Sequence, residues 1–248
     1  MKPAAALSKT QVLDFARDGY IVLRDMVPAA LVDAAQREID NEIARNTPPP
    51  GQAGFHFPAM QANPALHALV QGSVIVSAVE CLVAPGEVEV SPDAQAALNF
   101  PGHRHAPGAG HLDGWNPPEK RWTFTILVGV LLSDQERPNM GNLWLWPGTH
   151  LAHGAFFREH GAESMLTIPH NSPPIPLPEA RQVLGRAGDV VLAHYLLAHN
   201  IGGNTSDQLR YAAYFRLRRT GHDDRWKEAM ENEWLEWDGV REALQEPR

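Results

Sequence analysis

Cysteine is almost missing from this chain, and long apolar runs are missing altogether. Cys81 is the only cysteine among the 248 residues, which excludes an intrachain disulfide, and its apolar surroundings over 73–83 predict a buried thiol in a reducing compartment. The longest run that could enter a membrane, 124–132, is far shorter than the roughly 20 residues of a spanning helix. Residues 1–11 carry only a short alanine run, too short for a signal peptide. The sequence therefore predicts a cytoplasmic protein with no membrane partner.

Positive charge is also scarce. Only 21 Lys and Arg residues stand against 29 Asp and Glu, so the formal net charge is −8 and the sequence pI about 5.8. A chain of this charge has no basic field to bind DNA or RNA, so nucleic-acid binding is disfavoured. The hydrophobic content of 44% and the charged content of 20% are ordinary for a globular protein. We expect one domain over 1–248, of all-β or α+β type.

The first third of the chain is predicted to be helical. Apolar residues recur at helical spacing, with a capping-type Ser8 and a first-turn Pro28, and the proline-rich loop 47–54 interrupts them. These signals predict a helical N-terminal layer over about 8–83, with helices at 8–18, 28–46 and 63–83 and a strand at 20–25. A C-terminal helix is predicted over about 223–237, followed by a loose tail.

The middle of the chain, about 87–218, has a different character. Short β-rich runs alternate with clusters of Pro, Gly and Asn, and Pro147-Gly148 predicts a tight turn between two of them. The predicted strands lie at 95–100, 121–132, 142–147, 189–195 and 210–218. Several short strands separated by turn signals are typical of a β-sandwich or β-barrel core.

Four residues in this β-rich part form a chemically meaningful pattern. His111 and Asp113 make a His-x-Asp motif, His199 follows an apolar strand, and Arg210 comes eleven positions later. Two imidazoles and one carboxylate are the facial triad of non-haem Fe(II) oxygenases, which leaves coordination positions open for a co-substrate and dioxygen. A planar guanidinium binds the far carboxylate of a dicarboxylate in two places. The order therefore predicts a site for iron and 2-oxoglutarate.

A second His-x-Asp motif begins at His222. No histidine follows it in the sequence, so it lacks the downstream metal ligand that the first motif has. We predict that residues 222–224 form a solvated turn.

Longer motifs around these residues resemble a known family. They are FARDGYIVLRDMVP at 15–28, HLDGW at 111–115, GNLWLWPGTH at 141–150 and the run GDVVLAHYLLAHNIGGNTSDQLRYAAYFRL at 188–217. Over about residues 11–218 the chain resembles the phytanoyl-CoA dioxygenase family. The resemblance implies a mainly β fold with flanking helices, a double-stranded β-helix of the jelly-roll or cupin-like type.

The same resemblance implies roles for the four residues. His111, Asp113 and His199 are expected to bind Fe(II), and Arg210 to bind 2-oxoglutarate. Family members in which a small residue replaces the aspartate are halogenases, so Asp113 argues against halogenation. The expected activity is hydroxylation of a small organic substrate by dioxygen, with release of succinate and CO2. The acidic composition gives no support for a CoA ester in particular, and the sequence indicates no oligomeric state.

Further residues are candidates for the same site. Asn99 and Thr125 are predicted to hydrogen-bond 2-oxoglutarate. His103 and Trp115 are candidate substrate contacts, unless they hold plain loop or core positions. Arg216 shares strand parity with Arg210, so it either reaches a second anionic group or lies at the surface.

Two tryptophans are predicted on one face of a strand. Trp144 and Trp146 have the same parity, so both lie either in the barrel interior or against the helical layer. Parity does not decide between these two positions.

Two other functions remain open on this fold. A non-catalytic jelly-roll binding protein would keep the fold but not the turnover, and the intact set of metal ligands argues against it. A metal-dependent hydrolase or isomerase would use the same triad without 2-oxoglutarate, and Arg210 distinguishes it from an oxygenase, because such chemistry needs no carboxylate-binding guanidinium at that position.

Overall fold

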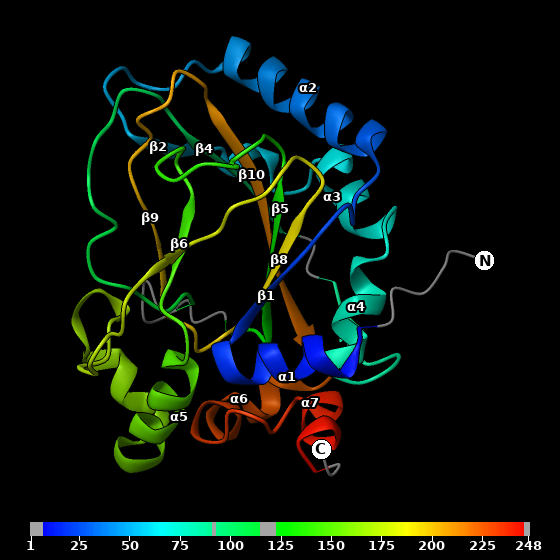
Figure 1. Cartoon of the computed structure of the whole chain (residues 1–248), viewed down its shortest axis with the longest axis vertical. Helices are drawn as coiled ribbons and strands as arrows, with labels where there is room; N and C mark the ends of the chain where they lie inside the picture. The colour runs from blue at the N-terminus through cyan, green and yellow to red at the C-terminus, as the bar shows by residue number, and fades with distance from the viewer. Residues whose placement is uncertain (1–6, 91–92, 115–122, 246–248) are drawn as a thin grey trace.

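The chain is built around two antiparallel β-sheets (Figure 1). The computed structural model describes residues 7–90, 93–114 and 123–245. In these residues the larger sheet has seven strands, and β3 (Val88–Glu89) pairs with β10 beside the main path. The main path is β1 (Tyr20–Leu23), β8 (Val190–His194), β5 (Ile126–Leu131), β10 (Arg210–Arg219), β4 (Ala94–Asn99) and β2 (Gly54–His56).

The smaller sheet has the order β7 (Arg181–Gln182), β6 (Leu143–Leu145) and β9 (His199–Ile201). Its strands β6 and β9 and the strands β4, β5 and β10 of the larger sheet line one cavity, so the two sheets face each other across it. Two facing antiparallel sheets are the arrangement that the sequence predicts for residues 87–218.

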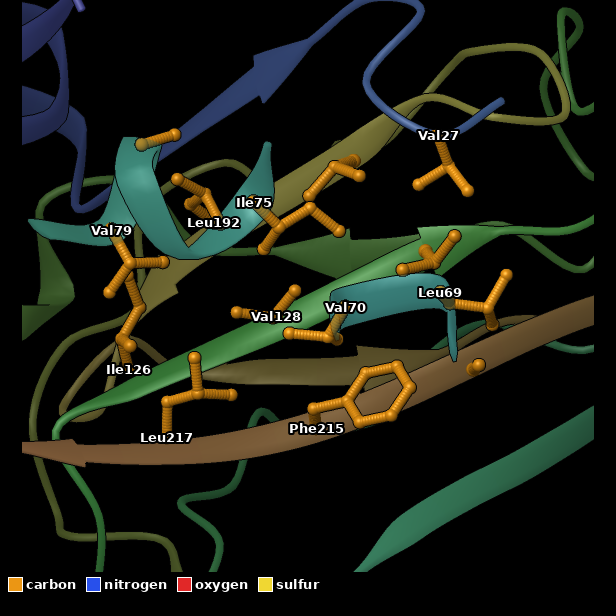
Figure 2. Close-up of a cluster of buried hydrophobic side chains, with 14 of the residues drawn as sticks. Val27, Leu69, Val70, Ile75, Val79, Ile126, Val128, Leu192, Phe215 and Leu217 are labelled. Atoms are coloured by element: carbon orange, nitrogen blue, oxygen red, sulfur yellow. The ribbon is translucent and has the colours of Figure 1, made fainter. Parts of the chain in front are cut away.

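Strand alternation divides the larger sheet into two faces. On β10, Phe215 and Leu217 point into a hydrophobic core together with Val128 of β5. Figure 2 shows these side chains packed against Leu69 and Val79 of the covering helices. The alternate positions of β10 point to the other face, toward the smaller sheet, because successive residues of a strand point to opposite sides.

The helices that supply this core lie on one side of the larger sheet (Figure 1). They are α1 (Lys9–Asp18), α2 (Ala29–Arg45), α3 (Pro64–Gln71), α4 (Ile75–Leu82) and α7 (Asp238–Gln245). Helix α1 begins with a capping box, in which the Ser8 side chain accepts from the backbone N–H of Gln11, and ends at Gly19 with a φ of 79°. These are the capping and stop signals that predict a helix over 8–18.

Within the described residues no single helix has the length and apolarity to cross a membrane. Only α3 and α4 together reach that length, and they are bent by 55°. Both helices bury their apolar residues in the core against the larger sheet.

The remaining helices reveal three wrong predictions. Helix α5 (Thr149–His160) follows the predicted turn at Pro147-Gly148 and α7 occupies the predicted tail, whereas α6 (His222–Glu231) ends six residues before the predicted end of the C-terminal helix. The buried side of α5 carries histidines, a threonine and a glycine beside Phe157, so it has no apolar stripe to detect. Helix α7 is fixed by buried Val240 and by the ion pair of Asp238 with Arg219.

Candidate metal centre

Two histidines are brought together at the edge of the smaller sheet. The backbone N–H of His111 donates to the carbonyl of His199 and the reverse bond is also made, at N···O distances of 3.1 and 3.2 Å. The centroids of the two imidazole rings lie 4.7 Å apart. Directly opposed residues of an antiparallel pair carry their side chains on the same face. The backbone pairing therefore makes neighbours of two histidines far apart in the sequence.

Asp113 completes a cluster of three ligands. Its Oδ1 lies 3.4 Å from Nε2 of His111 and 3.6 Å from Nε2 of His199. The ligand atoms of the three residues all lie within 4.8 Å of one another, so one ion could contact all of them. Two imidazole nitrogens and one carboxylate oxygen suit a divalent first-row transition metal with further positions open to other ligands.

A backbone carbonyl fixes the orientation of His199. Nδ1 of His199 lies 3.1 Å from the carbonyl oxygen of Leu197 and donates to it. In a neutral imidazole the other nitrogen, Nε2, then carries the free lone pair. This nitrogen faces Asp113, as a metal ligand must.

Arg216 orients the carboxylate of Asp113. Its Nε and Nη2 lie 3.0 and 2.6 Å from Oδ2 of Asp113, and Nη2 also donates to Oε1 of Gln95 at 2.9 Å. Oδ2 is thereby engaged and Oδ1 is left toward the histidines. Burial raises the pKa of Asp113, but the charge of Arg216 and the hydrogen-bonded histidines outweigh it and bring that pKa well below its usual value. The structure thus pairs Arg216 with Asp113, one of the three candidate metal ligands, and does not leave it at the surface.

Arg210 lies on the same face of β10, six residues earlier. Only 2% of it is exposed, its Nε donates to the carbonyl of Gly141 at 2.7 Å, and its Nη1 donates to the carbonyl of Ala97 at 3.4 Å. Nη2 is buried and has no hydrogen-bond partner, and no carboxylate among the described residues forms an ion pair with this guanidinium. A buried cation without a counter-ion is costly, so this position fits a bound anion.

Two adjoining cavities open at the centre. The smaller one, of about 150 Å³, is lined by all three ligands together with Leu127, Tyr214 and other residues of both sheets. The larger one, of about 410 Å³, extends from Asp113 between β10 and the segment that contains the short helix η1 (Pro58–Met60). The two share Gln95, Asp113 and Arg216. The larger volume lies in the range of small-molecule sites.

The two predicted 2-oxoglutarate contacts differ in outcome. Asn99 pairs with Arg210 across β4 and β10 and is fully buried, with Nδ2 donating to the carbonyl of Gly202 at 2.8 Å and Oδ1 unpartnered. It lies beside the anion position. Thr125 lies elsewhere, because its hydroxyl donates to Glu236 at 2.6 Å and accepts from the backbone N–H of Arg219 at 2.8 Å. The prediction for Thr125 is therefore wrong.

The second His-x-Asp motif joins Thr125 in a cluster around Glu236, apart from the candidate metal centre. His222 is 2% exposed, with Nδ1 lying 2.8 Å from Oε2 of Glu236 and Nε2 lying 2.9 Å from Oγ1 of Thr123. The prediction of a solvated turn is wrong for His222, because this side chain is buried and bonded to Glu236 of the C-terminal segment. It remains apart from the metal ligands.

The other candidates do not line the two cavities, or lie outside the described residues. His103 forms a bridge with Asn204 through an N···O bond of 2.9 Å and borders neither cavity. Trp115 lies outside the described residues. Trp144 and Trp146 pack on Gly202 and on Gly110, and neither lines the two cavities.

Among the residues that line the centre and that sequence reasoning missed are Gln95 and Tyr214. Both have the parity of recognised residues on their strands, since Gln95 lies four positions before Asn99 and Tyr214 lies four after Arg210. Period-two counting from those residues is the signal that could have found them.

The fold and the centre together define a class: a mononuclear metal enzyme on a double-stranded β-helix, the predicted fold class, with the triad at the rim of the smaller sheet. The family model for phytanoyl-CoA dioxygenase (PhyH) matches residues 15–212, so the chain belongs to this family. No curated protein matches the chain.

Solved structures with the same fold are more distant. HygX from Streptomyces hygroscopicus, crystallised with nickel and 2-oxoglutarate, is 19% identical, with a TM-score of 0.59 over 87% of this chain and 89% of its own. The non-heme alpha-ketoglutarate-dependent epimerase SnoN from nogalamycin biosynthesis is 20% identical, with a TM-score of 0.63 over 85% of this chain and 82% of its own. The carbocyclase SnoK from the same biosynthesis is 20% identical, with a TM-score of 0.59 over 90% of both chains. These likenesses support the predicted fold.

Proposed function

We propose that the protein is an Fe(II)- and 2-oxoglutarate-dependent oxygenase that hydroxylates a small organic substrate with dioxygen. The observation that carries the proposal is the buried guanidinium of Arg210. Its unpartnered Nη2 lies on the strand face that also carries Arg216, the residue bonded to Asp113. A metal-dependent hydrolase or isomerase has no need for a buried, carboxylate-binding guanidinium on this strand face.

The residues present fit both groups. One carboxylate oxygen and two imidazole nitrogens form a donor set that suits Fe(II), and the unpartnered Nη2 of Arg210 suits the far carboxylate of 2-oxoglutarate. HygX and SnoN have been crystallised with 2-oxoglutarate (alpha-ketoglutarate) and a metal ion. Bound together, iron, 2-oxoglutarate and dioxygen supply the oxidation of a C–H bond, with succinate and CO2 as co-products.

The protein's own contribution is binding, orientation and exclusion of water. His111, Asp113 and His199 would bind the metal, with Arg216 fixing the rotation of the Asp113 carboxylate. Arg210 would fix one end of the co-substrate, so that its other end lies toward the metal. The smaller cavity has an apolar wall, which limits water around the reacting groups; it is formed by Leu127, Leu143 and Ile201.

The larger cavity is the proposed substrate site. It adjoins the metal ligands only at Asp113, and its wall carries the polar side chains of His56, Gln61 and Arg218. A long acyl chain would offer no hydrogen-bond partner to the side chains of His56 and Gln61, at about 1–3 kcal/mol for each polar group left unsatisfied. We therefore propose a small polar substrate. HygX bound to hygromycin B and SnoN bound to nogalamycin RO are precedents for small-molecule substrates on this fold.

Hydroxylation is the proposed outcome, and product mass tests it. Similar structures include an epimerase and a carbocyclase. Hydroxylation adds one oxygen atom to the substrate, epimerisation leaves the mass unchanged, and ring closure by oxidation removes two hydrogens. A product that lacks the added oxygen would replace hydroxylation by one of the other two reactions.

The proposal is tested first by anaerobic visible absorption. Fe(II) and then 2-oxoglutarate are added to the protein freed of metal, and a weak metal-to-ligand charge-transfer band should appear only after both. His199→Ala should abolish the band. Arg210→Ala should need about 100-fold more 2-oxoglutarate, because two charge-assisted hydrogen bonds are lost.

Arg218→Ala is the matched control, because it removes an arginine from the same strand that lines only the larger cavity. It should leave the 2-oxoglutarate requirement unchanged. If the wild-type protein binds one Fe(II) and gives no band, 2-oxoglutarate is not the co-substrate, and a metal-dependent hydrolase or isomerase becomes the better account.

A further inference from the structure

A segment distant in sequence from the metal ligands is bonded to the backbone that carries two of them. The carbonyl of Asn171 accepts from the backbone N–H of Leu112 at 2.9 Å, and Oγ of Ser172 donates to the carbonyl of Gly110 at 2.5 Å. Gly110 precedes His111, and Leu112 lies between His111 and Asp113. The two bonds therefore flank His111, and the bond at Leu112 lies directly before Asp113.

The opposite side of the same backbone is also fixed. His111 pairs with β9, and Gly110 lies so close to its neighbours that an added Cβ would be 2.8 Å from Cβ of Ala198 and 2.9 Å from Trp146. Leu112 is fully buried in the hydrophobic cluster that also contains Met165. The ligand-bearing backbone is thus packed between the smaller sheet and the 170–172 segment.

The 170–172 segment adopts an unfavourable local conformation. His170 and Asn171 both have a φ of 55°, the left-handed region, where two successive non-glycine residues are rare. Residues in this conformation are strained and persist where the surrounding contacts determine them. This left-handed turn includes Asn171 and directly precedes Ser172, the two residues whose carbonyl and hydroxyl groups bond the ligand-bearing backbone.

We propose that the 170–172 segment is a positioning element for the metal centre, which sets the separation of His111 and Asp113 through Leu112 and Gly110. The inference deepens the proposed function, since it concerns the same metal site. Two ligands on one short loop can diverge unless their backbone is fixed, and outer contacts of metal ligands change metal affinity by about 10- to 100-fold when removed.

A purely structural role would affect stability without affecting the metal. Ser172→Ala removes the bond to Gly110, and Ser164→Ala is the matched control, because its Oγ donates to the carbonyl of Gly161 at 2.7 Å in the neighbouring 3-10 helix η3 (Ala162–Thr167). Asn171→Val adds a β-branched side chain that disfavours positive φ, whereas Asn171→Gly tolerates it and keeps the carbonyl.

The test measures Co(II) binding by its visible absorption, without 2-oxoglutarate, together with the unfolding midpoint of each variant. We expect Ser172→Ala and Asn171→Val to bind Co(II) about tenfold more weakly than the wild type. Ser164→Ala and Asn171→Gly should bind like the wild type, and Ser172→Thr, which keeps a hydroxyl, should recover most of the affinity.

The contrary result is equally definite. If Ser172→Ala and Asn171→Val bind Co(II) like the wild type and lower only the unfolding midpoint, as Ser164→Ala does, the segment is structural and the inference is overturned. Failure of the two proposals can be told apart, because wild-type protein that binds Co(II) but gives no Fe(II)–2-oxoglutarate band overturns the proposed function alone. Wild-type protein that binds no Co(II) overturns both.

Discussion

Arg210 and Arg216 lie on one face of one strand, yet their surroundings give them opposite tasks. Arg216 has a carboxylate partner, Asp113, at 2.6 Å, whereas Nη2 of Arg210 has none. In the proposed function the partnered arginine therefore holds Asp113, and the unpartnered one is left to bind the co-substrate. Each assignment has a separate consequence when the side chain is removed.

Replacing Arg216 by glutamine should weaken metal binding. The substitution leaves the buried Asp113 without its cationic partner, so the carboxylate loses the interaction that outweighs burial in its pKa and is free to rotate. We expect Co(II) or Fe(II) affinity to fall about tenfold. Arg218→Gln, two residues along the strand, should bind metal like the wild type, and equal affinities for the two variants would contradict the role given to Arg216.

The proximity of His111, Asp113 and His199 could be predicted because each lies in a recognisable motif, and the structure brings the three within one metal's reach. The role of Arg210, which has the same fixed spacing and strand context, stays a prediction. The parity of a residue in a strand predicts the face on which its side chain lies, but not which side chain from another element it contacts. Thr125 shows this, because its partner Glu236 comes from the far C-terminal segment and no local pattern records that contact.

At the scale of elements, the Thr125–Glu236 network joins the start of β5 to the end of the chain. Glu236 is 2% exposed and bonds His222, Thr125 and, at 3.3 Å, Arg225. Burial raises the pKa of Glu236, and these partners bring it below its usual value. The carboxylate is thus the centre of a buried charged network.

Glu236→Gln should destabilise the fold without affecting the metal. The amide cannot accept from all three partners, and disrupting a buried charged pair costs about 3 kcal/mol. The check is urea unfolding combined with Co(II) titration. Glu163→Gln is the control, since its ion pair with Lys227 is exposed and should contribute about 0–1 kcal/mol. A metal affinity that falls with Glu236→Gln would show that the network supports the site.

The segment around η1 forms one wall of the larger cavity, and its blockage tests the proposed substrate site. Gln61→Trp should fill part of this cavity while leaving the Fe(II)–2-oxoglutarate band unchanged, because Gln61 borders only the larger cavity. Once a substrate is known, its KM should rise about tenfold or more, the cost of a lost fit of roughly 1.4 kcal/mol. Gln52→Trp, in an exposed loop, should have no effect, and an unchanged KM for Gln61→Trp would move the substrate elsewhere.

Helix α5 escaped prediction because its buried side is not apolar. The buried residues of α5 include His150 and His153, polar side chains that a hydrophobic pattern counts as exposed. Strand β5 shows the complementary difficulty, since all its residues from Ile126 to Leu131 are buried and no alternation marks its two faces. A hydrophobic pattern indicates which residues are buried. In α5 and β5 burial is decided by tertiary contacts, so the pattern does not reveal which side of the element faces the core.

For the molecule as a whole, the fold class followed from the motifs and from the change in periodicity near residue 87. The order of strands did not. β1, near the start of the chain, pairs with β8, which lies about 170 residues later, and β2 pairs with β4 in the same sheet. Such pairings depend on contacts between distant segments, which a single sequence leaves unspecified.

Three buried histidines at the junction of α1, α5 and β8 affect the stability of the whole molecule. His150, His153 and His194 each donate a ring N–H to a backbone carbonyl, at 3.1, 2.6 and 2.9 Å. Burial lowers the pKa of His150 to about 4 and that of His153 to about 4, and it lowers that of His194 well below its ordinary value. Asp18 acts in the opposite direction on His150 but is outweighed. At neutral pH the three are uncharged.

Acid should therefore destabilise the fold well above the range in which carboxylates protonate. The unfolded chain, with ordinary histidine pKa values near 6.5, binds more protons than the folded chain, so stability is full above that value and falls as pH decreases toward 4. Asp189 and Glu236, whose pKa values are lowered from 3.8 and 4.5, begin to lose their contribution only at the acid end of this range and lose it fully below it.

Urea unfolding at pH about 7.5 and about 5 should show a loss of roughly 2 kcal/mol per titrating histidine. His153→Gln keeps a side-chain donor but removes one titrating group, so its loss between the two pH values should be smaller by about that amount. Equal losses in the variant and the wild type would mean that His153 is not neutral in the folded protein.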